Sequence, residues 1–185
     1  ASGPRLPLAQ ASFRSAAYPS LIEIVREFLG RSGRAVVTRA CLGVAGPVLA
    51  GRATLTNLDW PPLVEGELAE ALGLTSTRLL NDLEAIAWGA PALEPADWTP
   101  LHTAQPLAGG SIAVIAPGTG LGEAYLTWDG ARYRAYACEG GHTDFAPATL
   151  EQVELARFLL QRWEHVSYER VCSGLGLPNL YAFLK

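Results

Sequence analysis

The chain has 185 residues, enough for one large domain or two small ones. Hydrophobic residues make up 49% and charged residues 17%, which excludes a largely disordered chain. The net charge of -4 argues against nucleic acid or an anionic membrane as a partner, and no apolar run is long enough to span a bilayer. The three cysteines are scattered without a CxxC pair, so we expect reduced thiols in a cytoplasmic protein.

The first third of the chain predicts one helix and two strands. A capping box, Ser20-Leu-Ile-Glu23, begins an amphipathic helix that we expect to end at Gly30. Small and β-branched apolar residues over 34–45 predict a buried strand, and a second strand is expected over 48–58. This part of the chain is therefore predicted to mix helix and sheet.

The middle of the chain leads to a polar pair at the start of a helix. The pattern predicts a helix over 63–72, a strand over 77–80 and a helix from Asn81 to about Trp88. The stretch 94–110 is rich in Pro and has no periodicity. It is the best candidate for a domain boundary.

The last part of the chain predicts three strands and then helices. Asp129-Gly130 is typical of a β-hairpin with a type I′ turn, and Thr149-Leu-Glu-Gln152 is a second capping box, for a helix that reaches about Trp163. The remaining predictions are strands over 111–116, 124–128 and 132–138 and short helices over 167–172 and 178–185. The alternation of strands and helices predicts an α/β protein with a mixed sheet.

Asn81 and Asp82 follow a predicted strand at the end where α/β proteins bind ligands. An Asp at that position can accept a proton from a sugar hydroxyl as a general base, while Asn81 orients a neighbouring hydroxyl. The alternative is an ordinary helix N-cap with an acidic first turn. The local sequence leaves both interpretations open.

Gly118-Thr-Gly-Leu-Gly122 forms a glycine turn after a strand. Its glycines let backbone N–H groups approach a phosphate, and Thr119 adds a hydroxyl donor. No Lys follows, as a Walker A loop requires, and a strand follows where a Rossmann fingerprint needs a helix. The alternative is an ordinary glycine hairpin.

Glu139-Gly-Gly-His142 also follows a strand directly. Its carboxylate and imidazole can bind vicinal hydroxyls, and the alternative is a surface turn with solvated polar groups. The other histidines, His102 and His165, show no metal-ligand spacing, so no metal site is predicted from these residues. Glu169 is either a further sugar acceptor or a surface partner of Arg170.

In their order along the chain, these motifs resemble the bacterial glucokinase family over nearly the whole sequence. The most specific motif is Glu139-Gly-Gly-His-Thr-Asp-Phe-Ala-Pro147. The others are Gly43-Val-Ala-Gly-Pro47, Thr56-Asn57 with Trp60, Leu80-Asn-Asp82, Gly118-Thr-Gly-Leu-Gly122 and Glu169-Arg-Val-Cys-Ser-Gly174 with Asn179-Leu-Tyr181.

The resemblance implies an α/β, ribonuclease-H-like, actin/hexokinase-type two-domain fold that is incomplete at both ends of this chain. It places a small domain without its first strand over 1–95 and part of the large domain over 96–185. It also implies ATP-dependent phosphorylation of glucose at the 6-hydroxyl, at the entry to glycolysis, with Mg²⁺ as a cofactor. Many relatives form dimers, so we expect a cytoplasmic homodimer that binds glucose and ATP but neither nucleic acid nor a membrane.

The resemblance also assigns roles to individual residues. Asp82 would be the catalytic base on the 6-hydroxyl. The sugar-binding residues would be Asn57, Asn81, Asp82, Glu139, His142 and Glu169. The residues that face the ATP phosphates would be Gly118, Thr119 and Gly120.

This sequence also departs from the family pattern. The Asp-x-Gly-Gly-Thr loop and the adenosine-binding glycine segment are both missing, so we expect the 185-residue chain to be inactive on its own. Pro117 stands where the family has a small residue, and the zinc-binding cysteines of the related repressors are absent. Two other hypotheses stay open: a non-catalytic sugar-binding or regulatory relative, and another phosphotransferase or nucleotidase of the same superfold.

Overall fold

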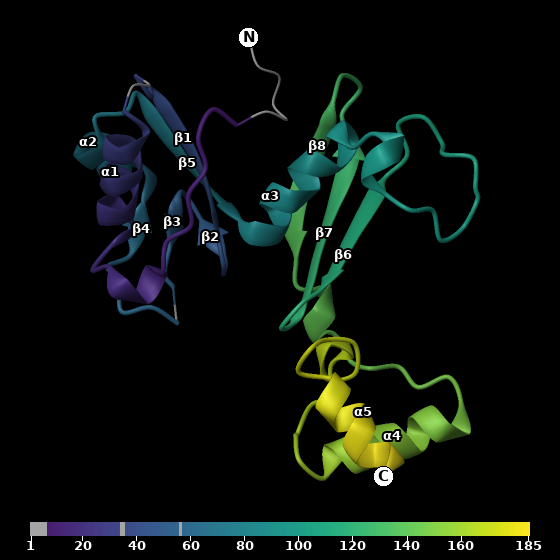
Figure 1. Cartoon of the computed structure of the whole chain (residues 1–185). Helices are drawn as coiled ribbons and strands as arrows, with labels where there is room; N and C mark the ends of the chain where they lie inside the picture. Colours follow the sequence, from purple (N-terminus) through teal and green to yellow (C-terminus); the bar gives the residue numbers. More distant parts are fainter. Residues whose placement is uncertain (1–6, 34–35, 56) are drawn as a thin grey trace. The chain divides into compact units, whose positions relative to one another are not determined.

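The computed structural model describes residues 7–33, 36–55 and 57–185, and it divides the chain into two compact units, Ala1–Asp82 and Leu83–Lys185 (Figure 1). The first unit contains η1 (Ser15–Ala17), α1 (Leu21–Ser32), β1 (Arg39–Val44), β2 (Val48–Leu49), β3 (Arg52–Ala53), β4 (Leu63–Val64), α2 (Glu65–Leu72) and β5 (Ser76–Asn81). The elements from the junction onward are α3 (Asp82–Gly89), η2 (Ala90–Ala92), η3 (Pro95–Asp97), β6 (Ile112–Pro117), β7 (Leu121–Trp128), β8 (Tyr133–Cys138), η4 (Gly140–His142), α4 (Leu150–Leu160), η5 (Tyr168–Arg170) and α5 (Leu177–Leu184).

The sheets confirm an α/β protein but not the predicted mixed sheet. In the first unit, β1 and β5 pair in parallel, and β2, β3 and β4 form an antiparallel sheet. In the second unit, β6, β7 and β8 are antiparallel. Among the described residues, each sheet is therefore wholly parallel or wholly antiparallel, because the hairpins and the parallel pair belong to different sheets.

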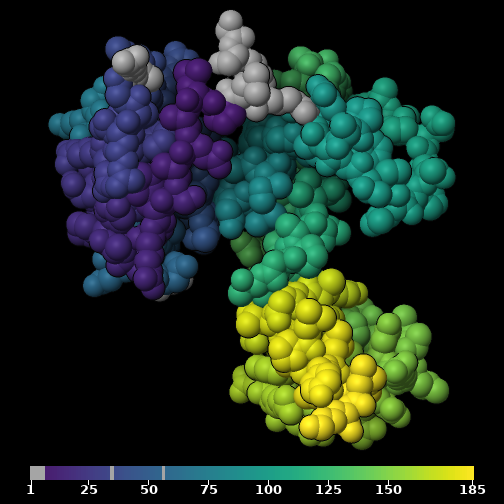
Figure 2. All heavy atoms as spheres, viewed as in Figure 1, coloured from purple at the N-terminus to yellow at the C-terminus, as the bar shows by residue number. Residues whose placement is uncertain are grey.

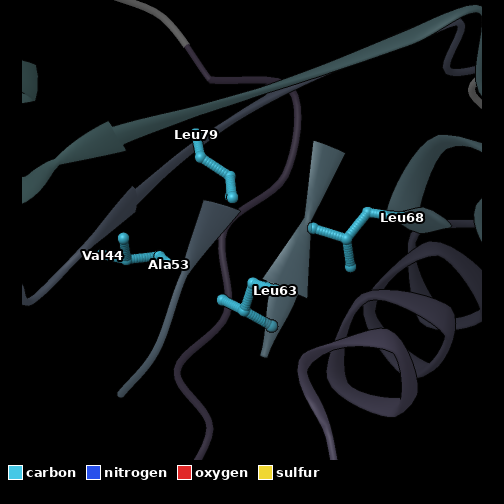
Figure 3. Packing of buried hydrophobic residues seen from close by; sticks show 5 residues of the cluster. All are labelled: Val44, Ala53, Leu63, Leu68 and Leu79. Atoms are coloured by element: carbon cyan, nitrogen blue, oxygen red, sulfur yellow. The ribbon is translucent and has the colours of Figure 1, made fainter. Parts of the chain in front are cut away.

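The core of the first unit lies between its two sheets and α2. Figure 3 shows five buried side chains that converge there, from β1, β3, β4, α2 and β5. They are Val44, Ala53, Leu63, Leu68 and Leu79. Leu79 is only 1% exposed, so this core fixes β5, the strand that ends at Asn81.

The helix starts follow the predicted capping residues, whereas two helix ends do not. The Ser20 hydroxyl accepts from the Glu23 N–H, and the Thr149 hydroxyl accepts from the Gln152 N–H, as the capping boxes predict. However, α1 continues past Gly30 to Ser32, because Gly33 is the residue with a left-handed φ of 70°. The helix end predicted at about Trp163 is also wrong, since α4 ends at Leu160.

The segment 48–58 forms a hairpin instead of the single strand predicted there. Ala50 and Gly51 both have positive φ, 48° and 72°, between the paired residues Leu49 and Arg52. Two positive φ values in a two-residue loop define a type I′ turn. The prediction failed because Ala is an uncommon residue in that conformation.

The hairpin predicted at Asp129-Gly130 does form, between β7 and β8, but its turn is not type I′. Gly130 has a φ of 95°, whereas Asp129 is not among the residues with positive φ. Asp129 closes the loop through its side chain instead, which accepts from the N–H groups of Ala131 and Arg132. The hydrogen bond from the Arg132 N–H has the largest effect on the pKa of Asp129. Together with those from the Ala131 N–H and the Arg134 side chain, it holds this pKa well below its usual range.

The second unit contains two apolar clusters. In the first, Leu83 and Ala87 of α3 pack with Ala124 and Leu126 of β7. This packing explains why the division of the chain falls between Asp82 and Leu83, with α3 counted in the second unit. The domain boundary near residue 95 stays a prediction. In the second, α4 and α5 pack around Leu155, Leu159 and Val166, and Figure 2 shows these helices in yellow-green and yellow. The described helices include none with the length and apolar character needed to span a membrane.

We expect Leu79→Ala to lower the free energy of unfolding by about 2–5 kcal/mol, because the substitution leaves a cavity between β5 and α2. Leu49→Ala is the matched control, since Leu49 is 74% exposed, and its effect should stay within about 0.5 kcal/mol. Urea denaturation of the two variants and the wild type measures both values. Equal losses in the two variants would show that Leu79 is not part of a tightly packed core.

Candidate functional site

The predicted site residues fall on both compact units. The first unit carries Asn57, Asn81 and Asp82. The second unit carries Gly118, Thr119, Gly120, Glu139, His142 and Glu169.

Asn81 and Asp82 lie at the carboxyl end of the parallel strand pair. Asn81 is the last residue of β5 and pairs in register with Val44, the last residue of β1, while Asp82 begins α3. The Asn81 Nδ2 donates to the carbonyl oxygen of Gly46, 3.2 Å away. The predicted junction of strand and helix is therefore confirmed, and one face of the Asn81 amide is fixed by the loop after β1.

Asn57 lies on the wall of a cavity of about 490 Å³ in the first unit. The wall also contains Val44, the residue opposite Asn81, and Trp60, whose indole N–H donates to the Tyr18 carbonyl oxygen at 2.7 Å. Thr56, the neighbour of Asn57 in the predicted motif, lies outside the described residues. The cavity wall thus includes the last residue of β1, and the Gly46 carbonyl oxygen that holds the Asn81 amide follows the same end of β1.

His142 brings the predicted sugar residues of the second unit together. Its Nδ1 lies 3.4 Å from Glu139 Oε2, and its Nε2 lies 3.8 Å from Glu169 Oε1. The side chains of His142 and Glu139 are 62% and 72% exposed, whereas that of Glu169 is 19% exposed. The cluster thus has one enclosed carboxylate beside two groups that solvent reaches.

The two glycines of the Glu139 loop allow this arrangement because the loop passes close to β7. A Cβ added at Gly141 would overlap the backbone carbonyl oxygen of Leu121, and one added at Gly140 would overlap the Glu123 carboxylate. The η4 turn then closes with a hydrogen bond of 3.0 Å from the His142 N–H to the Glu139 carbonyl oxygen. Gly141 is therefore required for the room that it leaves beside the backbone of β7, whereas at Gly140 the Glu123 side chain would have to move.

The carboxylate of Glu169 contacts the glycine turn. Its Oε2 accepts from the Leu121 N–H at 2.9 Å. Arg170, its alternative partner, instead lies over the Trp163 ring, with Cζ 4.8 Å from the ring centroid. Glu169 thus faces the cluster around His142, as the sugar-binding hypothesis requires.

A short antiparallel contact explains why the Glu139 loop and Glu169 meet. The Tyr168 N–H donates to the Thr143 carbonyl oxygen at 3.1 Å, and the Phe145 N–H donates to the Val166 carbonyl oxygen at 2.8 Å. These bonds join the segment after His142 to the segment before Glu169. The sequence showed no sign of this pairing, because it joins residues that are distant along the chain.

Two buried polar residues, to which the sequence assigned no role beyond membership of a family motif, hold the backbone at Glu169. The Ser173 hydroxyl donates to the Glu169 carbonyl oxygen at 2.7 Å and accepts from the Gly176 N–H at 3.0 Å. The Asn179 Nδ2 donates to the Arg170 carbonyl oxygen at 2.9 Å. A polar side chain within the apolar run of α5 is a signal that points to such a structural role for Asn179.

Backbone hydrogen bonds join the glycine turn to the segment that follows Glu169. The Gly118 and Thr119 carbonyl oxygens accept from the N–H groups of Gly174 and Leu175, at 2.8 and 3.1 Å. Thr119 itself is exposed, so its hydroxyl can reach a ligand. Within the described residues, no three His, Cys, Asp or Glu side chains are grouped as a metal site needs.

Known proteins match both the sequence and the fold. A family model described as Glucokinase matches residues 2–185. The glucokinase of Nostoc punctiforme is 37% identical over 178 residues, which cover 95% of this chain and 52% of that protein. A crystal structure of glucokinase from an Antarctic psychrotroph gives a TM-score of 0.83 at 35% identity, over 93% of this chain and 53% of that chain. A glucokinase of Balamuthia mandrillaris, crystallised in complex with glucose, gives 0.59 at 25% identity, over 89% and 50%. The chain therefore spans about half the length of these relatives.

We expect Ser173→Ala to lower the free energy of unfolding by about 0.5–1.5 kcal/mol, because it removes the hydrogen bond to the part-buried Glu169 carbonyl oxygen, whereas the Gly176 N–H keeps the Ser173 carbonyl oxygen as an acceptor. Ser111→Ala, at an exposed position, is the control and should change stability little. Urea denaturation measures both. If Ser173→Ala were as stable as Ser111→Ala, the hydroxyl would not hold the Glu169 backbone.

Proposed function

The chain belongs to the glucokinase family, and from this we propose that the protein to which it belongs transfers a phosphoryl group from ATP to the 6-hydroxyl of glucose. One observation carries the proposal: Glu139 and His142 of one loop meet Glu169, which is distant from them in sequence, in one cluster beside the glycine turn. Because the chain spans about half the length of its relatives, the activity is proposed for the longer protein.

The cluster has the chemistry that a sugar requires. Two carboxylates accept hydrogen bonds from hydroxyl groups, and an imidazole can donate or accept. A sugar held by several such bonds leaves buried groups unpaired when a hydroxyl is missing, which gives specificity. The glucose complex of the Balamuthia mandrillaris glucokinase supports glucose as the sugar.

We propose that Asp82 is the general base. As the sugar 6-oxygen attacks the terminal phosphorus, its proton would pass to the Asp82 carboxylate. Asn81, whose amide the Gly46 carbonyl oxygen holds, would orient a neighbouring hydroxyl, and Asn57 would bind the sugar from the cavity wall. These roles rest on the matching family motifs and on the position of Asn81 and Asp82 at the end of β5.

The glycine turn is the proposed phosphate contact. Gly118 and Gly120 have no side chain to block an approach, and the exposed Thr119 hydroxyl can donate to a phosphate oxygen. Bound Mg²⁺ would supply neutralisation of phosphate charge. The chain's own contribution to phosphate binding here would be the backbone of the turn and the Thr119 hydroxyl.

Two broader features belong to the same proposal. The fold would be the two-domain actin/hexokinase type, with a boundary near residue 95, and the protein would act as a cytoplasmic homodimer. The shared name of the relatives favours a kinase over a non-catalytic sugar-binding relative or another phosphotransferase.

Asp82→Asn in the full-length protein should lower kcat by about 10²–10⁴-fold, because the amide cannot take the proton of the 6-hydroxyl. The affinity for glucose should change much less, since Asn can still hydrogen-bond a hydroxyl. Glucose-dependent ADP formation measures kcat. Glu67→Gln, which neutralises an exposed carboxylate on α2, is the control. Equal turnover by Asp82→Asn and wild type would contradict the base assignment.

The purified 185-residue chain should show no glucose-dependent ADP formation, whereas the full-length protein should. The reason is that the chain lacks the Asp-x-Gly-Gly-Thr loop that the family resemblance assigns to phosphate and metal. The coupled assay is run on both at equal concentration, with circular dichroism to show that each is folded. Turnover by the 185-residue chain would refute this expectation.

A further inference from the structure

Glu169 and the glycine turn, which the proposed function assigns to the sugar and to the phosphates, are in direct contact. Resting on that function, we propose that Glu169 couples the two ligands. Its Oε2 is held by the turn and its Oε1 is left for the sugar. Gly120 is then a positioning residue for sugar binding, because only glycine leaves room for this carboxylate.

The hydrogen bond at Oε2 fixes one end of the carboxylate. Leu121 is 7% exposed, and its N–H donates to Oε2 at 2.9 Å. A hydrogen bond to an ionised oxygen is stronger than one between neutral groups. The other oxygen, Oε1, lies 3.8 Å from His142 Nε2, on the side where the sugar residues gather.

The Glu169 side chain occupies the space beside Gly120 that a Cβ would need. A Cβ added at Gly120 would overlap Glu169 Oε2 and lie 3.2 Å from its Cδ. Gly118, in the same turn, has nothing within 4 Å of an added Cβ. Neither glycine is among the residues with positive φ, so the difference between them is room and not backbone conformation.

The turn and the segment that carries Glu169 are also joined through their backbones. Gly174 and Leu175 donate to the carbonyl oxygens of Gly118 and Thr119, and a Cβ at Gly174 would come within 2.9 Å of the Gly118 oxygen. A displacement of Glu169 is therefore passed to the turn, and the reverse holds as well. Binding at one end then changes the affinity at the other by the same factor.

The test compares Gly120→Ala with Gly66→Ala, at an exposed position of α2, in the full-length protein, by measuring the Kd for glucose calorimetrically without nucleotide. Losing a well-placed hydrogen bond to a charged group costs about 10–100-fold in affinity, so we expect Gly120→Ala to raise the Kd at least tenfold. Gly66→Ala should leave the Kd for glucose within about twofold, because an added Cβ there meets nothing within 4 Å.

A double variant separates this role from a phosphate role. Glu169→Ala removes the carboxylate that the new methyl group would meet, so Gly120→Ala on that background should not weaken glucose binding further. If Gly120→Ala weakened only nucleotide binding, or if the two effects on glucose added independently, the proposal would be overturned.

Glu169→Gln tests the coupling without crowding the turn, in case Gly120→Ala does not fold. It keeps the shape of the side chain but cannot accept at both ends. The Kd for glucose is measured with and without a non-hydrolysable ATP analogue, and we expect the ratio to move towards one. An unchanged ratio would overturn the coupling. Wild-type protein that neither binds glucose nor forms glucose-dependent ADP would instead overturn the proposed function.

Discussion

The candidate site of the second unit depends on how closely the chain can approach the backbone of one residue, Leu121. Its N–H binds the Glu169 carboxylate, and its carbonyl oxygen stands where a Cβ at Gly141 would be. Gly120 and Gly141 therefore serve the same constraint from two sides. A side chain at Gly141 would push the Glu139 loop away from β7, and one at Gly120 would displace the Glu169 carboxylate. Close access to the backbone of Leu121 therefore brings Glu139, His142 and Glu169 together.

The first unit meets a different constraint, the alignment of two parallel strands. Leu79, 1% exposed, holds β5 in the core, and the register with β1 puts Asn81 opposite Val44. The chain beyond β1 then supplies the Gly46 carbonyl oxygen that Asn81 binds. Because parallel strands end at the same edge, the loop and the Asn81–Asp82 junction had to be neighbours. Hydrophobic packing and register thus position the candidate residues of the first unit, whereas close backbone approach positions those of the second.

Local chemistry decided which features could be predicted from the sequence. Ser20 and Thr149 cap their helices through residues three positions away, so a short window predicts both. The end of α1 at Gly33 instead of Gly30 depends on which glycine takes a positive φ, which no local pattern specified. Ser173 and the pairing of Tyr168 with Thr143 depend on residues brought together by folding. The motifs named the polar residues of the candidate site, but the contacts that orient them are tertiary.

The unequal exposure of the three clustered side chains has an energetic consequence for ligand binding. Glu169 is 19% exposed and already bound to the Leu121 N–H, so little of its freedom is left to lose. Glu139 and His142 are 72% and 62% exposed, and ordering each rotamer-rich side chain costs about 0.5–1.5 kcal/mol on binding. In the proposed sugar complex, the preorganised carboxylate would give the ligand its first fixed contact, and the two exposed groups would adjust to the positions of its other hydroxyls. Specificity would then rest on the enclosed residue, because a group fixed out of solvent cannot turn to water when its partner is missing.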